Sequence, residues 1–184
     1  LIERLQQAVA VVTEEKPAVL AAQGIYYDPA PHTAGKIAFM FPGQGSQYPH
    51  MGSDLVCCFP GAMEAVQAAD HRFDQEPPLW QILFPRPALS DEQRQDQAGA
   101  LRRTDVAQPA IGAVSLAMLS ALGYFNVRPD ATCGHSYGEL TALYAAGWIN
   151  QETLLTLSVT RGRLGLRFPI VSGRGPRQGQ PDGR

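Results

Sequence analysis

The sequence predicts an α/β domain in which a short, largely parallel sheet is flanked by helices. Two short runs, residues 36–41 and 128–133, are typical of strands, and the first is apolar enough to be buried on both faces of a parallel sheet. Each run leads directly into a glycine-containing turn, and apolar residues with helical spacing follow. Strands that alternate with helices favour a parallel sheet, because the helix returns the chain to the edge where the strand began.

The composition is that of a folded domain. The chain has 184 residues, of which 45% are hydrophobic and 17% are charged. A chain of this length buries roughly 70% of the surface that its unfolded form exposes, which excludes a disordered or collagen-like chain and a disulfide-rich mini-domain. Residues 1–160 carry 9 Lys/Arg and 16 Asp/Glu, a net charge of −7, whereas residues 161–184 carry 6 Arg and one Asp, a net charge of +5. The acidic body argues against nucleic acid as a partner.

The cysteine pattern and the hydropathy bear on the compartment. Cysteines at positions 57, 58 and 133 have no C-x-x-C spacing, so neither a disulfide framework nor a metal site is expected. No apolar run approaches the roughly 18 residues of a membrane span, and no secretory signal pattern is present. These features predict reduced thiols in a cytoplasmic protein without membrane association.

The first 35 residues are expected to precede the domain proper. Residues 1–16 place apolar side chains along one helical stripe, and Pro17 separates them from a second short helix over 18–23. Residues 24–35 contain two prolines and are typical of an extended linker on a surface.

The later elements follow from periodicity and from residues that favour helix ends. Pro109 is expected at the first position of a helix, where proline is best tolerated, while Gly147 ends one helix and Asn150 caps the next. The predicted segments are a helix over 60–73, a loop or weak helix over 86–103, and helices over 109–122, 138–146 and 150–163. Residues 165–184 are rich in arginine, glycine and proline and are expected to be disordered.

Residues 134–138 (Gly-His-Ser-Tyr-Gly) fit G-x-S-x-G, the nucleophile elbow. Small residues two positions before and two after the serine let the backbone turn sharply from a strand into a helix. The helix N-terminus then points backbone N–H groups toward the serine oxygen. Ser136 is therefore the candidate nucleophile, and an ordinary turn is the alternative.

A second glycine-containing turn, residues 43–47, follows the first predicted strand. It lacks the third glycine of a dinucleotide-binding loop and the Gly-Lys-Ser/Thr of a P-loop. It nevertheless lies at the carboxyl end of a parallel strand, where α/β sheets place their ligands. It is either a second part of the site or a structural turn.

Together, residues 41–47 (Phe-Pro-Gly-Gln-Gly-Ser-Gln) and 134–139 (Gly-His-Ser-Tyr-Gly-Glu) resemble the malonyl-CoA:acyl carrier protein transacylase family. The chain is most similar to the acyltransferase domains of polyketide synthases and polyunsaturated fatty acid synthases, from about residue 36 to 164. The resemblance implies an α/β-hydrolase-like large subdomain, truncated before the ferredoxin-like small subdomain. Residues 1–35 are similar to the linker between a ketosynthase and an acyltransferase, and residues 165–184 depart from the family.

The resemblance implies an enzyme that works through an acyl ester on Ser136. It implies that no cofactor is bound, that malonyl-CoA would be the acyl donor, and that the phosphopantetheine thiol of an acyl carrier protein would be the acceptor. A ketosynthase and other megasynthase domains are expected in cis. The oxyanion hole would be formed by the backbone N–H groups of Gln44 and Tyr137. The reaction would belong to polyketide or fatty acid biosynthesis. The large side chain of Tyr137, directly after the nucleophile, slightly favours malonyl over larger extender groups.

The resemblance also implies three substrate-binding residues. Arg161 matches the arginine that grips the free carboxylate of malonyl groups, since a guanidinium fork pairs with a carboxylate through two parallel hydrogen bonds. Gln108 matches a position that lines the pocket, and His135 lies beside the nucleophile without being its base. The alternatives are a solvent-facing arginine at a helix end and a polar residue in a helix-starting turn.

The histidines depart from the family pattern. The family's general base is a histidine well downstream of the serine, whereas the four histidines of this chain, at positions 32, 50, 71 and 135, all precede Ser136. We therefore expect a weakly active or inactive fragment, with a tail that reflects a frame change or a misjoined gene. The competing interpretations are an α/β-hydrolase-type esterase or thioesterase and a non-catalytic remnant of a megasynthase.

Overall fold

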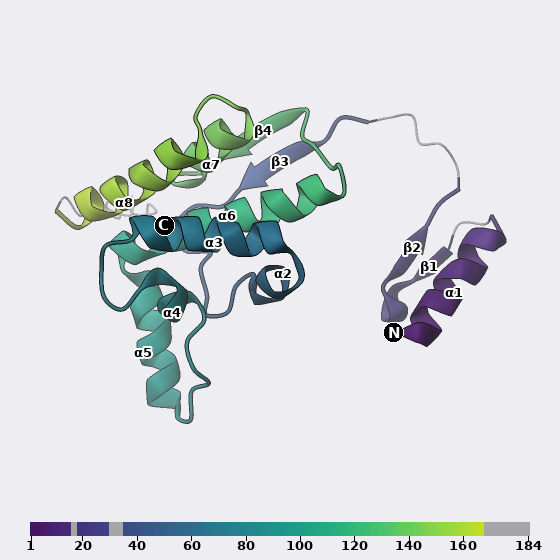
Figure 1. The fold of residues 1–184 in the computed structure, drawn as a ribbon, viewed down its shortest axis with the longest axis horizontal. Coiled ribbons are helices and arrows are strands. Elements are labelled where there is room, and N and C mark those ends of the chain that lie inside the picture. The colour runs from purple at the N-terminus through teal and green to yellow at the C-terminus, as the bar shows by residue number, and fades with distance from the viewer. Residues whose placement is uncertain (16–17, 30–34, 168–184) are drawn as a thin grey trace, which may run out of the picture. The chain divides into compact units, whose positions relative to one another are not determined.

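A computed structural model describes residues 1–15, 18–29 and 35–167. The chain divides into two compact units, Leu1–Lys36 and Ile37–Arg184 (Figure 1). The predicted tail lies outside the described residues from 168 onward, while residues 165–167 continue the last helix. Each unit is described by itself below.

The first unit consists of one helix and a two-stranded antiparallel hairpin. Helix α1 (Ile2–Thr13) has no buried residue. Strand β1 (Ala18–Leu20) pairs with β2 (Ile25–Tyr27), and the short 3₁₀ helix η1 (Ala21–Gln23) joins them. Gly24 follows with φ +70°, a left-handed conformation that glycine adopts without steric cost.

The predicted short helix over 18–23 is therefore wrong in its first half. Residues 18–20 are extended because Ile25, Tyr26 and Tyr27, which have β-branched or aromatic side chains, offer a strand partner shortly after the turn. These three partners lie in the segment that was expected to be an unpaired linker.

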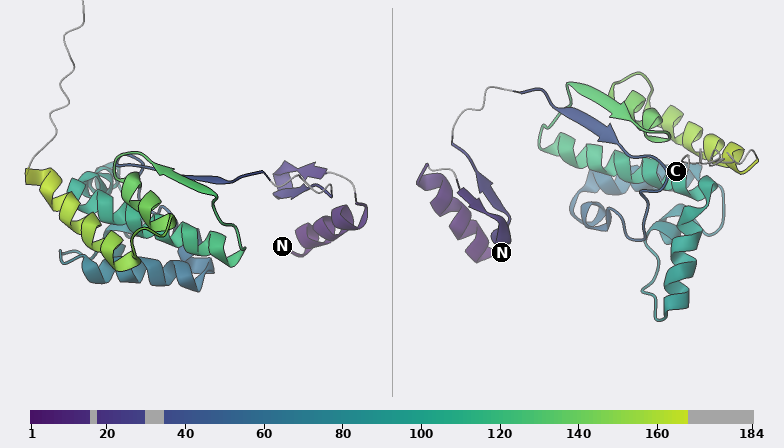
Figure 2. Two further views of the ribbon diagram at one scale, coloured as in Figure 1. Left: turned by 90° about the horizontal axis from the view of Figure 1, so that it is seen from above. Right: turned by 180° about the vertical axis from the view of Figure 1, so that it is seen from behind.

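The second unit contains a parallel pair of strands and a layer of helices. Its elements, in chain order, are β3 (Ala38–Phe41), α2 (Ser53–Cys58), α3 (Pro60–Arg72), α4 (Leu79–Leu83), α5 (Asp91–Arg102), α6 (Thr104–Tyr124), β4 (Ala131–Gly134), α7 (Gly138–Ala145) and α8 (Gln151–Arg167). Strands β3 and β4 run parallel, with Phe41 opposite Gly134. Helix α7 packs on both strands, and α6 packs against α3, α7 and α8 (Figure 2). The predicted α/β class with a short parallel sheet is confirmed.

Helix α6 forms the centre of the core. Nearly all of its first two thirds is buried. It is also long and apolar enough to cross a membrane by length and composition, contrary to the sequence-based expectation, but 72% of its most apolar window is buried inside the unit. That burial identifies it as a core helix.

The helix begins at Thr104 and not, as predicted, at Pro109. Pro109 lies in the second turn of the helix, where it has no N–H to donate and one backbone hydrogen bond is lost. The turn before it is held by Val106 and Ala107, whose N–H groups donate to the Arg103 carbonyl at 3.0 and 2.7 Å. Burial of the residues on either side outweighs the lost bond, so packing overrides the preference of proline for a helix start.

Strand β3 is buried on only one side, which corrects the expectation of two buried faces. Phe41 is 9% exposed and Met40 is 81% exposed, the alternation of a strand with one covered face. A largely apolar cavity of about 760 Å³ runs along β3 toward Ile111 and Val114 of α6.

Candidate active site

The two glycine-containing turns leave adjacent ends of the parallel strands. Because Phe41 and Gly134 stand opposite one another in the register, β3 and β4 end side by side. The His135 N–H donates to the Phe41 carbonyl at 3.2 Å and extends the pairing one step into the second turn. The sheet thus brings together two turns that lie about ninety residues apart in the sequence.

Ser136 stands at the tip of the second turn in a strained conformation. Its φ of +57° lies in the left-handed region that non-glycine residues rarely adopt. Gly138 donates its N–H to the His135 carbonyl at 3.0 Å and begins α7. A Cβ at position 138 would lie 2.2 Å from the Phe41 carbonyl oxygen, so only glycine fits there. The predicted strand–turn–helix context of Ser136 is present.

The first turn lies directly on the second. A Cβ added at Gly43 would lie 2.5 Å from the His135 carbonyl oxygen and 3.2 Å from Ser136 Cβ. Gln44 is the next residue in the chain after this close approach. Within the described residues the N–H groups of Gln44 and Tyr137 make no hydrogen bond, which leaves both available to a ligand.

Arg161 reaches the serine from helix α8. Its Nη1 donates to Oε1 of Gln108 at 3.2 Å, and its Nη2 lies 3.5 Å from Ser136 Oγ. The side chain is half-buried between the helices. The structure therefore places Arg161 at the site, and not in the solvent-facing position that was its alternative.

A chain of amides connects Arg161 with the first turn. Gln108 is buried on α6, and its Nε2 lies 3.5 Å from Oε1 of Gln44. Nε2 of Gln44 in turn donates to Oγ1 of Thr104 at 3.1 Å. Sequence reasoning missed Thr104, because the helix was predicted to begin five residues later.

The side chain of Tyr137 points away from the serine into the core. It is fully buried, and its hydroxyl lies 2.6 Å from that of Ser158 on α8. Burial raises the pKa of Tyr137 to about 12, although the neighbouring hydroxyls of Ser158 and Thr141 and the charge of Arg161 act in the opposite direction. Only the backbone of Tyr137 faces the site, so its bulk does not support a choice among acyl groups.

His135 is exposed and lies against the first turn. Its Nδ1 would be 3.1 Å from a Cβ at position 43. Among the described residues no histidine is hydrogen-bonded to Ser136. The structure thus brings together Ser136, Gln44, Gln108, Arg161, His135 and the backbone of Tyr137.

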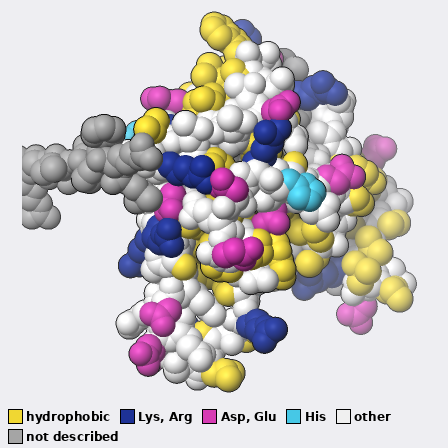
Figure 3. Space-filling model, turned by 60° about the vertical axis from the view of Figure 1, so that its left-hand side comes forward, with side chains coloured by type: hydrophobic (Ala, Val, Ile, Leu, Met, Phe, Trp, Pro, Cys, Tyr) yellow, Lys and Arg dark blue, Asp and Glu magenta, His cyan; other side chains and the backbone are white. Residues whose placement is uncertain are grey.

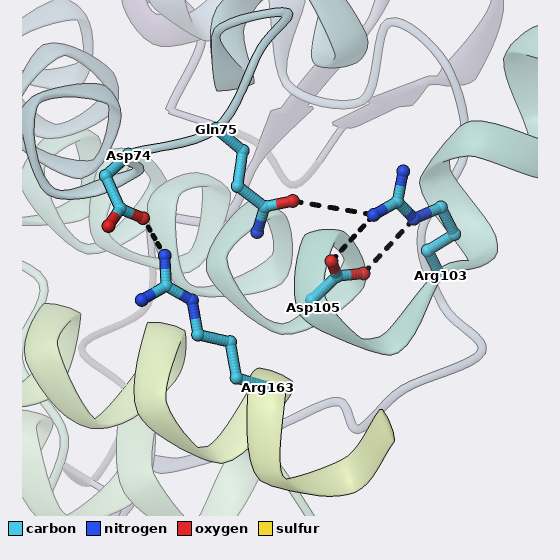
Figure 4. Close-up of polar contacts among 5 residues, drawn as sticks. All are labelled: Asp74, Gln75, Arg103, Asp105 and Arg163. Carbon is cyan, nitrogen blue, oxygen red and sulfur yellow. Dashed lines mark hydrogen bonds and ion pairs between the residues drawn. The ribbon is translucent and has the colours of Figure 1, made fainter. Parts of the chain in front are cut away.

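Two carboxylates near the first turn of α6 are paired with arginines. Asp105, buried in the first turn of α6, accepts hydrogen bonds from Arg103 at 2.8 and 3.3 Å, and Asp74 forms an ion pair with Arg163 (Figure 4). On the face shown in Figure 3, acidic and basic side chains are interspersed without a large area of either sign.

Comparison with known proteins identifies the family of this chain. The family profile described as "Acyl transferase domain" matches residues 38–176. A highly reducing polyketide synthase of Penicillium crustosum is 37% identical over 129 residues, which cover 69% of this chain and 5% of that protein. The chain thus spans about a twentieth of the length of that curated relative.

Solved structures of two related proteins share the fold. The acyltransferase domain from the second module of the salinomycin polyketide synthase has a TM-score of 0.65 and 30% identity, and the match covers 86% of this chain and 34% of that one. The malonyl CoA-acyl carrier protein transacylase from Clostridium perfringens has a TM-score of 0.59 and 31% identity, with 70% and 37% covered. The family profile covers well over half of the residues, and the nucleophile turn, the Gln44 turn and Arg161 lie within it. The chain therefore belongs to the acyl transferase domain family.

Proposed function

We propose that this site transfers a malonyl-type acyl group from coenzyme A to the phosphopantetheine thiol of an acyl carrier protein, in polyketide or fatty acid synthesis. The observation that carries the proposal is the guanidinium of Arg161 beside Ser136 Oγ, 3.5 Å away. The names of the related enzymes, a polyketide synthase and a malonyl CoA-acyl carrier protein transacylase, support the same substrates.

The reaction balances in two steps. In the first, Ser136 Oγ attacks the thioester carbonyl carbon, the C–S bond breaks, and coenzyme A leaves as the thiol with the serine proton. In the second, the carrier thiol attacks the serine ester, the acyl group returns to sulfur, and Ser136 regains a proton. Each tetrahedral intermediate carries one negative oxygen.

The N–H groups of Gln44 and Tyr137 would stabilise that oxygen. Neither is hydrogen-bonded within the described residues. Tyr137 is the N-cap residue of α7, and Gln44 follows Gly43, which packs closely against His135 and Ser136. One such donor typically lowers the barrier by about 3–4 kcal/mol. The partial positive charge of the helix N-terminus acts in the same direction.

Arg161 would select donors that carry a second carboxylate. The guanidinium can give two parallel hydrogen bonds to a malonyl carboxylate. An acetyl group would give this half-buried guanidinium no carboxylate to bind, which costs binding free energy relative to a malonyl group. Gln108 holds the guanidinium in place by accepting from Nη1.

Proton transfer is the weakest part of the site in this chain. In subtilisin, removing the base of the serine nucleophile costs about six orders of magnitude in turnover. Since no described histidine is bonded to Ser136, we infer that the chain alone forms the acyl ester slowly and turns over little. We also propose a cytoplasmic location, ketosynthase and other megasynthase domains in cis, and a linker role for residues 1–35.

The test is acylation by radiolabelled malonyl-CoA, with intact-mass analysis to locate the ester. We expect label on Ser136 over hours and no label on Ser136→Ala. Label that passes to water faster than to an added holo carrier protein would indicate a hydrolase instead. A wild-type chain that stays unlabelled, with its fold intact, would identify a non-catalytic remnant.

A further inference from the structure

We propose that Thr104 is a positioning residue that holds the Gln44 turn and helix α8, which carries Arg161, at one fixed separation. The inference rests on the proposed function, because it assigns Thr104 a task in aligning the oxyanion donor with the carboxylate-binding group. Within the described residues no hydrogen bond joins Thr104 to Ser136.

One side of Thr104 holds the Gln44 turn. Its Oγ1 accepts a hydrogen bond from Gln44 Nε2 at 3.1 Å. The only other contact of this amide within the described residues is the longer one, 3.5 Å, with Gln108. Thr104 therefore provides the shorter hydrogen bond to Gln44, whose backbone N–H is the proposed oxyanion donor.

The other side of Thr104 sets how close α8 lies. A Cβ added at Gly162 would lie 2.9 Å from the Thr104 carbonyl oxygen and 3.0 Å from Asp105 Cα. A Cβ added at Gly165 would lie 2.8 Å from Thr104 Cγ2. Helix α8 thus packs directly on Thr104, because positions 162 and 165 of the helix have no side chain. Arg161 immediately precedes the first of these glycines, so its reach depends on this contact.

The first turn of α6 is suited to act as a fixed support. Asp105 is buried and is held by two hydrogen bonds from Arg103, which also approaches Gln75 (Figure 4). On α8, Arg163 forms an ion pair with Asp74 (Figure 4). A displacement of Thr104 relative to the Gln44 turn or to α8 would therefore change how the proposed oxyanion donor and Arg161 are aligned.

The two contacts can be separated by substitution. Thr104→Val keeps the shape and the methyl group that faces Gly165 but removes the hydroxyl that holds Gln44. We expect acylation by malonyl-CoA and by acetyl-CoA to slow by the same factor, about five-fold for one lost hydrogen bond. The ratio of the two rates should stay that of the wild type.

Gly165→Ala should have the opposite signature. Its Cβ would push against Thr104 Cγ2 and displace α8, so the preference for malonyl-CoA over acetyl-CoA should fall by about ten-fold or more, the size of one charged hydrogen bond. Thr104→Ser removes that methyl group and keeps the hydroxyl. The double variant Gly165→Ala/Thr104→Ser should therefore recover the preference, which a general loss of folding would not permit.

Gly99→Ala is the matched control, because a Cβ at this helical glycine meets nothing within 4 Å. Nuclear magnetic resonance of the full chain supplies a readout that needs no activity. Thr104→Val should shift the Gln44 side-chain amide, and Gly165→Ala should shift the Arg161 Nε–H signal, with Thr104→Ser returning it toward the wild-type position.

The outcomes separate the two proposals. If the wild type is not acylated, the proposed function fails, while the resonance shifts still decide the role of Thr104. If the wild type is acylated but Thr104→Val matches it in rate and in the Gln44 resonance, the positioning role is wrong. The absence of recovery in the double variant would contradict the contact between Thr104 and α8.

Discussion

The backbone and the side chain of Tyr137 have different roles. Its backbone N–H is the proposed oxyanion donor, while its ring fills the core and its hydroxyl lies 2.6 Å from that of Ser158. The strained turn at Ser136 is therefore tied to α8 by the residue that follows it. A side chain of this size next to a nucleophile thus serves packing and not acyl-group choice.

The Tyr137 hydroxyl gives the stability a distinctive dependence on alkaline pH. A folded-state pKa of about 12, above the ordinary value of 10.0, means that the folded chain keeps its proton longer than the unfolded chain. The resulting stabilisation is complete below pH 10 and is lost as the pH rises toward 12. Between pH 9 and pH 11 the wild type should lose about 1 kcal/mol more unfolding free energy than Tyr137→Phe. Urea titrations at both pH values measure this, and equal losses in the two proteins would contradict it.

Arg161 can be tested against its neighbour on the same helix. Arg161→Lys replaces the fork by a single ammonium group that cannot bind Gln108 and a carboxylate in the same way. We expect acylation by malonyl-CoA to fall about ten- to hundred-fold and acylation by acetyl-CoA to change little.

Arg163→Lys is the control for Arg161→Lys, since its exposed pair with Asp74 contributes little. Competition between the two acyl-CoA donors, followed by intact mass, gives the ratio for each variant. A similar change in both variants would argue against a specific role for Arg161.

At the scale of elements, helix α6 packs closely against the residue after the nucleophile, and Gly112 makes this contact possible. A Cβ at Gly112 would lie 2.2 Å from the Tyr137 hydroxyl oxygen and 3.4 Å from Ser158 Oγ. The turn can therefore approach α6 only because position 112 has no side chain. This contact links the core helix with the strand–turn–helix segment.

Gly112→Ala should destabilise the chain by about 1–3 kcal/mol, the usual cost of overpacking. Removing the hydroxyl with Tyr137→Phe should recover part of that loss, because the nearest clashing atom is then absent. Gly99→Ala, which meets nothing within 4 Å, should instead stabilise its helix by up to about 1 kcal/mol. A double-mutant cycle measures this effect by urea unfolding of the wild type, Gly112→Ala, Tyr137→Phe and the double variant. If the losses of unfolding free energy are purely additive, the Cβ at position 112 does not clash with the Tyr137 hydroxyl.

Elements with strong local signals could be predicted from the sequence. Strand β3 and helix α3 agree closely with their predicted ranges, and Asn150 caps α8 through the Thr153 N–H at 2.8 Å. Helix α5, predicted only as a loop or weak helix, also has a local signal. Ser90 accepts from the Gln93 N–H, while Gln93 Oε1 accepts from the Leu89 N–H, a local exchange of the capping-box kind.

The remaining differences depend on contacts between distant segments. The start of α6 and the pairing of β1 with β2 are decided by burial and by a strand partner, neither of which local spacing reveals. In the site, the G-x-S-x-G pattern predicted Ser136, and the resemblance to the transacylase family implied the places of Gln44 and Arg161. Thr104 and Ser158 could not be found that way, because their partners lie 60 and 21 residues away.

At the scale of the whole molecule, the two compact units have separate sets of internal contacts. The second unit begins with its own anchor: the Ile37 N–H donates to Asp130 Oδ2 at 2.8 Å, and the Asp130 N–H donates to the Ile37 carbonyl at 2.7 Å. We therefore expect removal of residues 1–34 to leave the unfolding free energy of the second unit and the acylation of Ser136 unchanged.

Thermal and urea unfolding of the shortened chain check this expectation. A deletion that also removes Ile37 is the comparison, because it breaks both bonds to Asp130 and should be less stable. A loss of stability in the shorter deletion as large as in the longer one would mean that the two units depend on each other.

The left-handed backbone of Ser136 has a consequence for how this chain evolves. Glycine would relax that backbone and serine does not, so random drift toward greater robustness favours the replacement that destroys the nucleophile. We therefore expect serine to persist at this position only where its hydroxyl is under selection.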